Sequence, residues 1–386
     1  MAHQQHRPTV LHVRVVADQG GGPDKTILRS MRYLRQAGYR AAAAYIHPPG
    51  HDGINTILER AKREKAPVFA IADRGAFDAT SAFRLARLCR DLNVTIWHAH
   101  DYKSEALGLM IRGLRHIKLI STLHGYVHAD RKAQFLYEIG RQCLRAYDRV
   151  IAVSPDLLES ARKASVSPDR LSHIPNAIEL NDFSRTLTTT EAKQILNLNP
   201  ERYALGVVAR LSGEKRVDRA IETFHHLLQL GIDAELHILG DGPQRDQLEQ
   251  QAQARNALSR IHFHGWTADI RNHIQALDLQ LLTSTVEGLP NALLEAMALE
   301  VPVAATPVGG VRNLLEQGKA GILLDDQPEN WAPRIAALLT DGNARNNLIR
   351  NARARIETHY SFLNRMQRVI EIYDQLVMPN ATPNAA

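Results

Sequence analysis

Residues 284–298 read STVEGLPNALLEAMA, and the apolar run LDLQLLTS, which starts at residue 277, leads into them. The apolar run is typical of a buried strand and the segment from Pro290 onward of a helix, so this part of the chain is a strand, a glycine-bearing loop and a helix. Proline suits the first helical position, but Leu289 precedes it in place of Ser, Thr, Asp or Asn, the usual capping residues. The amide groups of the first turn therefore lack an evident partner, and helix starts of this kind bind anions.

The same alternation of short β-rich runs and amphipathic helical stretches continues along the whole chain, which is typical of parallel α/β sheets. In the first half, strands are predicted at residues 10–16, 40–46, 68–71, 94–98, 118–121 and 150–153. In the second half, they are predicted at residues 204–209, 235–239, 261–263, 279–282, 303–305 and 321–324. The expected fold class is α/β, with two doubly wound, Rossmann-like domains facing across a cleft.

The chain of 386 residues is too long for one typical domain. The alternating pattern breaks at HIPNAIELNDFSRT, residues 173–186, where proline and asparagine are followed by polar residues without periodicity. We therefore expect one domain over residues 1–180 and a second over 181–361. Residues 362–386 are expected to form a C-terminal helix that packs back on the first domain, followed by a loose tail. Ligands of such folds bind at the carboxyl ends of the strands, in the cleft.

Composition restricts the class of protein. An apolar fraction of 44% and a charged fraction of 23% are those of a soluble globular protein. Two cysteines without metal-type spacing favour a reducing compartment, and the N-terminal segment is too short and too alternating for a signal peptide or a membrane span, so we expect a cytoplasmic protein. Residues 1–180 hold 27 Lys and Arg against 17 Asp and Glu, a balance of +10, whereas the rest hold 20 against 24, or −4. This bias indicates an anionic partner, but no basic–aromatic interleaving or reader motif suggests nucleic acid.

Two segments of the second half bear residues suited to phosphate. GVVARLSGEKRVDRAIETF puts Arg210 just beyond a predicted strand and Lys215 at the start of the next helix, and a guanidinium beside an ammonium group suits a diphosphate. LHILGDGPQRDQL places Gly240 and Gly242 in a tight turn and Pro243 at the start of a helix. A lone Gly-x-Gly is equally compatible with an ordinary strand-to-helix turn.

In the first half, the glycines at residues 20–22 allow backbone amides to approach a phosphate or sugar. The Gly-Lys-Ser/Thr ending of a P-loop is absent, which disfavours a nucleoside triphosphatase. His98 and His100 share a face by strand alternation, but no third ligand is spaced to join them and no Asp-x-Asp occurs. Packing or hydrogen bonding is therefore favoured over a metal site, with His100, Asp101 and His124 expected to face the cleft.

The segments GGGP, HAHD, TLHG, IPNA, ARLSGEK, LGDGP, FHGW and EGLPNALLEAMALEVPVAATPVGGV together resemble the retaining nucleotide-sugar glycosyltransferases of family four, which have the GT-B fold. The resemblance covers nearly the whole chain, and its specific part is the Glu-x7-Glu element, Glu287 and Glu295, with Arg210 and Lys215. It implies that the donor sugar and diphosphate complete the uncapped helix start. Glu287 would then contact donor-sugar hydroxyls, Glu295 the nucleotide ribose, and Arg210 and Lys215 the diphosphate.

The resemblance also implies the remaining roles. The implied donor-binding residues are Gly21, Gly22, Gly240, Gly265, Gly288, Leu289, Pro290 and Asn291. His124 would line the sugar pocket and act in catalysis, His100 and Asp101 would lie on the acceptor side in the first domain, and the backbone around His264 and Gly265 would meet the base. The implied partners are a nucleotide-diphosphate sugar and a saccharide or lipid-linked acceptor that receives a hexosyl group; no cofactor and no metal are expected.

Four departures from the family pattern fall on turns or on neighbouring contacts. They are Asn176–Ala177 in place of Asn-Gly, Val217 and Glu300 in place of glycine, and Arg312–Asn313 in place of Pro-Glu. A nucleotide-sugar 2-epimerase, a phosphorylase and a non-catalytic nucleotide-sugar-binding protein stay open as alternatives. A glycosidase is disfavoured, because Glu295 lies inside the helix about 8 Å beyond Pro290. The basic first half suggests docking on the cytoplasmic face of an anionic membrane, against the alternative of a soluble enzyme acting on a soluble acceptor.

Overall fold

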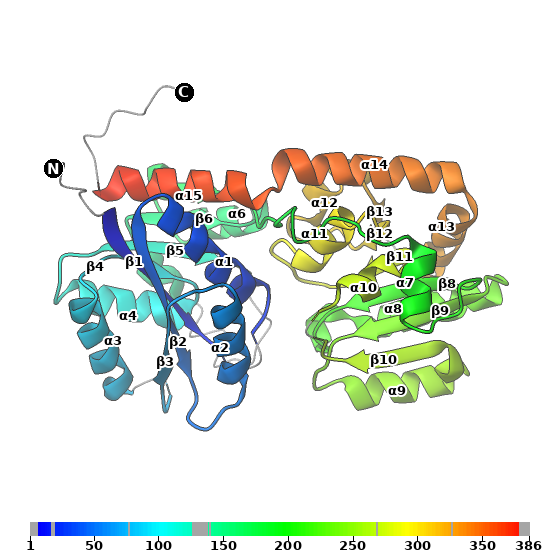
Figure 1. The fold of residues 1–386 in the computed structure, drawn as a ribbon, viewed down its shortest axis with the longest axis horizontal. Coiled ribbons are helices and arrows are strands. Elements are labelled where there is room, and N and C mark those ends of the chain that lie inside the picture. Colours follow the sequence, from blue (N-terminus) through cyan, green and yellow to red (C-terminus); the bar gives the residue numbers. More distant parts are fainter. Residues whose placement is uncertain are drawn as a thin grey trace. The chain divides into compact units, whose positions relative to one another are not determined.

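The alternating strands and helices form two parallel sheets (Figure 1). The structure is a computed structural model that describes residues 7–16, 20–75, 78–125, 138, 140–267, 269–325 and 327–377. The chain divides into two units. Unit 1 takes the described residues up to Asn176 and those from Leu363 onward, and unit 2 is Ala177–Phe362. The predicted fold class, two doubly wound α/β sheets, is confirmed.

The sheet of unit 1 has seven parallel strands in the order β3-β2-β1-β4-β5-β6-β7. The strands are β1 (Arg7–Val15), β2 (Tyr39–His47), β3 (Val68–Ala72), β4 (Val94–Ala99), β5 (Lys118–Leu123), β6 (Arg149–Ala152) and β7 (Leu171–His173). The sequence predicted all of these except β7. That strand has three half-buried residues, so it carries no apolar run that could be recognised.

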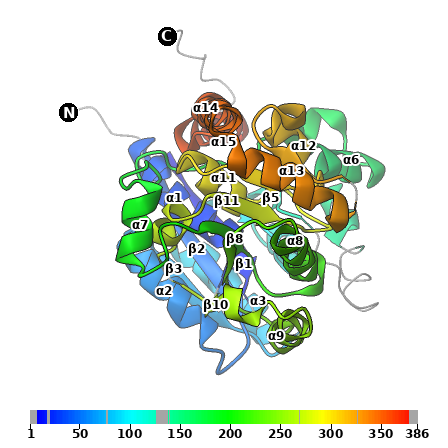
Figure 2. The same ribbon diagram turned by 90° about the vertical axis from the view of Figure 1, so that its right-hand side faces the viewer.

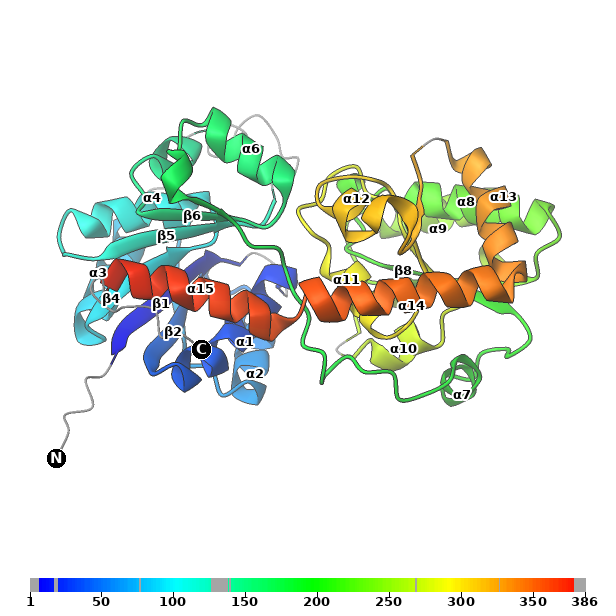
Figure 3. The ribbon, with the colours of Figure 1, turned by 90° about the horizontal axis from the view of Figure 1, so that it is seen from above.

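Helices cover both faces of this sheet. They are α1 (Gly22–Gln36), α2 (Gly53–Arg63), α3 (Ala79–Asp91), α4 (Tyr102–Arg112), α6 (Pro155–Lys163) and α15 (Phe362–Val377), with the 3-10 turn η1 (Pro168–Arg170). Helices α3, α4 and α6 share a core with Leu11, Val13 and Trp97. Figure 3 shows α15 lying across the strands. Its Tyr373 contacts His98, which follows Trp97 in β4 and therefore points to the opposite face of the sheet.

The sheet of unit 2 has six parallel strands in the order β10-β9-β8-β11-β12-β13, and the sequence predicted each of them. They are β8 (Tyr203–Val208), β9 (Ala234–Leu239), β10 (Ile261–Gly265), β11 (Leu279–Leu282), β12 (Val303–Ala305) and β13 (Ile322–Leu323). The helices are α7 (Thr189–Ile195), α8 (Val217–Gln229), α9 (Arg245–Ala254), α10 (Arg271–Gln275), α11 (Asn291–Ala298), α12 (Val311–Leu314), α13 (Pro328–Thr340) and α14 (Gly342–His359). The 3-10 turns are η2 (Gly213–Lys215), η3 (Leu258–Arg260) and η4 (Glu316–Gly318).

Unit 2 has two buried clusters, one on each face of its sheet. Helices α8, α9 and α13 contribute to one of them, and α11, α12 and α14 to the other. In Figure 2, α8 and α13 lie on one side of β8 and β11, and α7 lies on the other side. Among the described residues, no helix combines the length and the apolar character that crossing a membrane requires.

Candidate functional site

The first turn of α11 begins one residue later than predicted. Pro290 has extended backbone angles, φ −74° and ψ 120°, and is the N-cap, so the expectation that it takes the first helical position is wrong and Asn291 takes it. No side chain caps this turn, as the sequence indicated. The Oδ1 atom of Asn291 is shielded from solvent and has no hydrogen-bond partner among the described residues. A buried acceptor without a partner is costly, so this atom suits a ligand that brings a donor group.

Two charged residues from separate loops meet directly at this turn. Lys215 Nζ lies 2.7 Å from Glu287 Oε1, although the two residues are 72 positions apart. Ser284 Oγ donates a hydrogen bond of 2.7 Å to the same oxygen. The side chains of Lys215 and Glu287 are 23% and 10% exposed, so the pair lies near the surface and is accessible to a ligand. The sequence indicated neither this pair nor the contribution of Ser284.

Lys215 does not open the next helix, contrary to the prediction. It ends the 3-10 turn η2, and α8 begins at Val217 after Arg216, whose left-handed backbone has φ 47°. Hydrogen bonds then fasten this loop to the loop after β11. Thr283 Oγ1 donates to the backbone oxygens of Lys215 (3.2 Å) and Arg216 (2.8 Å), and Thr285 N donates to Glu214 O (2.8 Å). These hydrogen bonds hold the loop that bears Lys215 next to the loop that bears Glu287.

The glycines around these loops are required by close backbone approach. A Cβ on Gly240, where φ is +136°, would lie 1.8 Å from Ala209 O, and its amide donates to Gly265 O at 2.8 Å. A Cβ on Gly309 would lie 2.0 Å from the Glu287 backbone oxygen. Pro243 does not start a helix as predicted, since α9 begins only at Arg245. The Gly-x-Gly turn therefore has a structural role, which the sequence left open beside the donor-binding one.

The other donor residues of unit 2 lie in and around the same loops. Gly288 and Leu289 are buried between Glu287 and the helix start, and the Gly288 backbone oxygen accepts a 2.7 Å hydrogen bond from Gly310 N. Glu295 lies in the second turn of α11 and is 2% exposed. Arg210 is exposed, two residues beyond the end of β8.

In unit 1, the glycine turn is closed by a buried carboxylate. Asp24 Oδ2 accepts a 2.7 Å hydrogen bond from Gly21 N, and Asp24 Oδ1 pairs with Arg14 Nε at 2.9 Å. Gly22, which the sequence placed between the strand and the helix, is the first residue of α1. Gly20 has φ +76°, a left-handed backbone that residues with a side chain rarely adopt, so this position also favours glycine. The residues just before the turn, 17–19, lie outside the described part of the chain.

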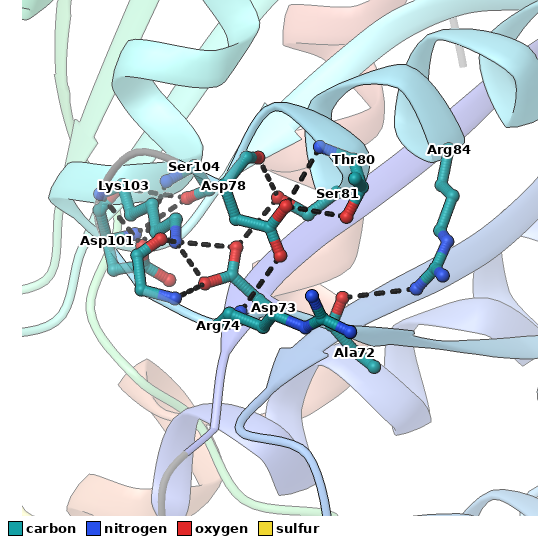
Figure 4. Close-up of polar contacts among 11 residues, drawn as sticks. Ala72, Asp73, Arg74, Asp78, Thr80, Ser81, Arg84, Asp101, Lys103 and Ser104 are labelled. Carbon is teal, nitrogen blue, oxygen red and sulfur yellow. Dashed lines mark hydrogen bonds and ion pairs between the residues drawn. The ribbon is translucent and has the colours of Figure 1, made fainter.

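Asp101 uses both carboxylate oxygens to hold backbone. Its Oδ1 accepts from the amides of Lys103 (3.0 Å) and Ser104 (2.9 Å), and its Oδ2 accepts from Val15 N (2.7 Å), so it caps α4 and fixes the end of β1. Figure 4 shows the adjoining cluster, in which Lys103 Nζ lies 2.6 Å from each carboxylate oxygen of Asp73. The sequence analysis missed this second pair, because the segments that carry it share no local pattern.

Four histidines gather at the carboxyl ends of β1, β4 and β5. His98 and His100 do share a face, with ring centroids 4.5 Å apart. The expectation that no third residue joins them is wrong: His12, paired in register with His98, brings three ring nitrogens within 4.8 Å of one another. Burial lowers the pKa of His12 to about 3 and those of His98, His100 and His124 well below the usual value, so all four are neutral at pH 7.

A small pocket lies at this edge of the unit 1 sheet. It is lined by His100, Tyr102, Glu105, Thr122, Leu123, His124, Gly125 and Arg141. Burial raises the pKa of Glu105 to about 8, and Ser121 Oγ donates a 2.7 Å hydrogen bond to it. Two predicted residues, His100 and His124, thus line one pocket with a carboxylic acid that the sequence did not single out.

Comparison with known proteins identifies the family. Residues 20–182 match the family described as Glycosyltransferase Family 4, and residues 188–355 match Glycosyl transferases group 1. The chain is 24% identical over 319 residues, with 78% of this chain and 80% of the relative covered, to the UDP-Gal:alpha-D-GlcNAc-diphosphoundecaprenol alpha-1,3-galactosyltransferase of Escherichia coli. It is 27% identical over 311 residues, 78% of either chain, to the N-acetyl-alpha-D-glucosaminyl L-malate synthase of Bacillus anthracis.

Its fold is similar to that of Anabaena HepE, crystallised with UDP and glucose, with a TM-score of 0.84 and 19% identity over 96% of this chain and all of that one. Both halves of the chain and its fold therefore agree with the resemblance seen in the sequence. The chain belongs to glycosyltransferase family 4 and has the GT-B fold.

Proposed function

We propose that this glycosyltransferase moves a hexosyl group from a nucleotide-diphosphate sugar to a lipid-linked or saccharide acceptor, with retention of anomeric configuration. The product would belong to a cell-surface polysaccharide or glycolipid. The observation that carries the proposal is the contact of Lys215 with Glu287 beside the uncapped first turn of α11. An ammonium group, a carboxylate and free helix amides are the groups that a sugar diphosphate needs.

The donor roles follow from the chemistry of these groups. The diphosphate takes the amide end of α11 and the cations Lys215 and Arg210, while Glu287 accepts hydrogen bonds from sugar hydroxyls. Glu295 holds the ribose, and the backbone near Gly265 meets the base. From unit 1, His124 and the backbone of the Gly21–Gly22 turn are assigned to the sugar, and His100 with Asp101 to the acceptor side. Asp101 then acts through the backbone that it fixes.

The reaction breaks the bond between the anomeric carbon and the diphosphate oxygen, and the acceptor hydroxyl oxygen bonds to that carbon on the same face. The hydroxyl proton leaves with the released nucleoside diphosphate. Negative charge develops on the diphosphate while the sugar becomes cationic, so Lys215, Arg210 and the α11 amides stabilise the transition state more than the ground state. Family membership favours retention.

The names of similar proteins narrow the first substrates to test. The E. coli relative is named for a UDP-galactose donor and a diphosphoundecaprenol-linked acceptor, and HepE was crystallised with UDP-glucose. We therefore infer a UDP-hexose donor and a lipid-linked acceptor for this chain. An acceptor of that kind would place the enzyme at the cytoplasmic face of a membrane, where its basic first half would meet anionic lipid.

Exposed apolar residues in unit 1 support membrane docking. Phe83 in α3 and Leu114 just after α4 are 70% and 73% exposed. Arginines 84, 87 and 90 lie in α3, and arginines 112 and 115 lie at or beyond the end of α4. Apolar side chains next to basic ones combine insertion between headgroups with attraction to anionic lipid.

Two measurements test the proposal. A thermal-shift panel of UDP-, GDP- and ADP-sugars should show stabilisation of several degrees by one nucleotide class, and a smaller stabilisation of the Lys215→Ala protein. With that donor and a lipid-linked acceptor, NMR of the first product should show the donor's anomeric configuration. An inverted linkage would contradict the mechanism. Turnover of the nucleotide sugar without any acceptor would favour an epimerase, and binding without turnover would favour a non-catalytic binding protein.

A further inference from the structure

Three of the four clustered histidines form a continuous hydrogen-bonded chain. His12 Nδ1 lies 2.9 Å from His100 Nε2, and His100 Nδ1 lies 2.9 Å from His124 Nε2. The two terminal atoms, His12 Nε2 and His124 Nδ1, are shielded from solvent and have no hydrogen-bond partner among the described residues. The chain therefore begins inside unit 1 and ends at His124, which lines the pocket at the end of β5.

Neutral imidazoles restrict this chain to two arrangements. A neutral ring has one N–H and one acceptor nitrogen, and each contact needs one of each. Either every Nδ1 is protonated at His12, His100 and His124, or every Nε2 is. In the first arrangement His124 offers an N–H donor at its free Nδ1 and His12 ends in a lone pair; in the second the two ends are reversed. The tautomer of His12 thus decides what His124 presents to a ligand.

Burial and nearby cations keep the three rings neutral. Burial, together with the charge of Arg365 in α15, lowers the pKa values of His12, His98 and His124. Arg14, which is paired with Asp24 at 2.9 Å, adds to the effect of burial on the pKa values of His100 and His124. Three neutral rings joined by two hydrogen bonds must share one tautomer.

We propose that His12 and His100 are positioning residues, which through this hydrogen-bonded chain fix the tautomer of His124 and so decide whether its Nδ1 donates or accepts a hydrogen bond in the pocket. The partner of that nitrogen would be a ligand oxygen, such as that of a sugar hydroxyl. The nature of the ligand rests on the proposed function, whereas the shared tautomer does not.

The same residues do not fit a metal ion. The rings of His12, His98 and His100 are stacked, with interplanar angles of 16–27°, so their lone pairs run in parallel planes and do not converge on one point. Both nitrogens of His98 are also taken, by Tyr373 OH at 2.6 Å and Thr122 Oγ1 at 2.7 Å. A chain of hydrogen bonds, rather than coordination, accounts for the cluster.

The first test reads the tautomer directly, without activity. The full-length protein is labelled with 15N at its 18 histidines, and spectra that correlate ring carbon protons with ring nitrogens distinguish N–H from lone-pair nitrogens. Signals are assigned by their loss in His12→Asn, His100→Asn and His124→Asn. We expect His12, His100 and His124 in one common form, either all Nδ1–H or all Nε2–H; a mixture of the two forms among these three rings in the wild-type protein would overturn the proposal.

The second test measures coupling between His12 and His124, which do not share a hydrogen bond. With a donor found by thermal shift, His12→Leu should lower kcat/KM about 10-fold in the wild-type background but less than about 2-fold in a His124→Leu background. Equal losses in both backgrounds would show that His12 acts independently of His124. Absence of turnover with every donor would count against the proposed function while leaving the spectral result intact.

Discussion

Replacing either partner of the Lys215–Glu287 pair should separate stability from activity. The two atoms lie 2.7 Å apart, where the attraction at an effective dielectric of about 20 is about 6 kcal/mol, but the lost hydration of two part-exposed ions offsets most of it. A net contribution of about 1 kcal/mol remains, which for a unit of this size shifts Tm by about 2–4 °C. Glu287→Gln and Lys215→Ala should therefore remain folded and melt within a few degrees of the wild-type protein.

Turnover should fall much further than stability. If each group contributes about 2–4 kcal/mol to the transition state, kcat/KM should drop by roughly 30- to 1000-fold in either variant. The pair also predicts opposite effects on free nucleoside diphosphate. Glu287→Gln releases Lys215 from its carboxylate partner, so the diphosphate should bind at least as tightly as to the wild-type protein, whereas Lys215→Ala should weaken it.

The assay follows nucleoside diphosphate release beside thermal melting and diphosphate titration. Lys193→Met is the matched control, because Lys193 Nζ lies 2.7 Å from Asp278 Oδ2 in the same unit and is more deeply buried. It should lose stability but keep the turnover of its folded fraction. Wild-type turnover in Glu287→Gln or Lys215→Ala would refute the assignment of that residue, and tighter diphosphate binding to Lys215→Ala would refute the charge argument.

Three further results are expected. The pKa of Glu105 is raised to about 8, so the folded state binds the carboxyl proton more tightly than the unfolded state, and stability should fall as pH rises from about 4.5 to about 8. Glu105→Gln should therefore flatten the dependence of Tm on pH between pH 5 and 9. An unchanged slope in that variant would contradict the burial argument. Gly240→Ala should cost about 3 kcal/mol or more, because its methyl group would lie 1.8 Å from a backbone oxygen, against about 1 kcal/mol for Gly231→Ala, which has left-handed backbone but open space. The protein should co-sediment with anionic but not with neutral liposomes at low salt. The bound fraction should fall as salt rises and should be smaller for a Phe83→Ser/Leu114→Ser double variant. If the protein stays in the supernatant with anionic liposomes at low salt, a soluble acceptor is favoured.

Short-range sequence patterns were sufficient to predict most strands and the uncapped start of α11. Apolar runs predicted every strand but β7, and the uncapped start of α11 was visible from Leu289 and Pro290 alone. The loops that bear Lys215 and Glu287 follow β8 and β11, which are neighbours in the sheet. The ion pair itself could not be predicted, because it depends on strand order and on hydrogen bonds between the loops.

The histidine cluster shows the same limit. His98 and His100 were placed on one face by alternation, which is a property of a single strand. His12 joined them only because β1 and β4 are adjacent and register His12 opposite His98. The role of Asp101 was likewise hidden, since its third partner, Val15 N, lies 86 residues away. Contacts of this kind are set by topology, and the sequence alone does not state the topology.

Unit 2 is, in chain order, an insertion into unit 1, because α15 returns to the unit that the first 176 residues began. The two ends of the insertion are joined: Ile178 bridges to Ser361, with Ile178 N donating to Tyr360 O at 2.8 Å and Phe362 N donating to Ile178 O at 2.9 Å. A chimera that exchanges donor specificity between relatives should therefore replace the whole insertion at both seams. A single crossover near residue 176 would bring in a foreign α15. That helix would replace the Tyr373 hydroxyl that contacts His98 and the Arg365 charge that acts on His12.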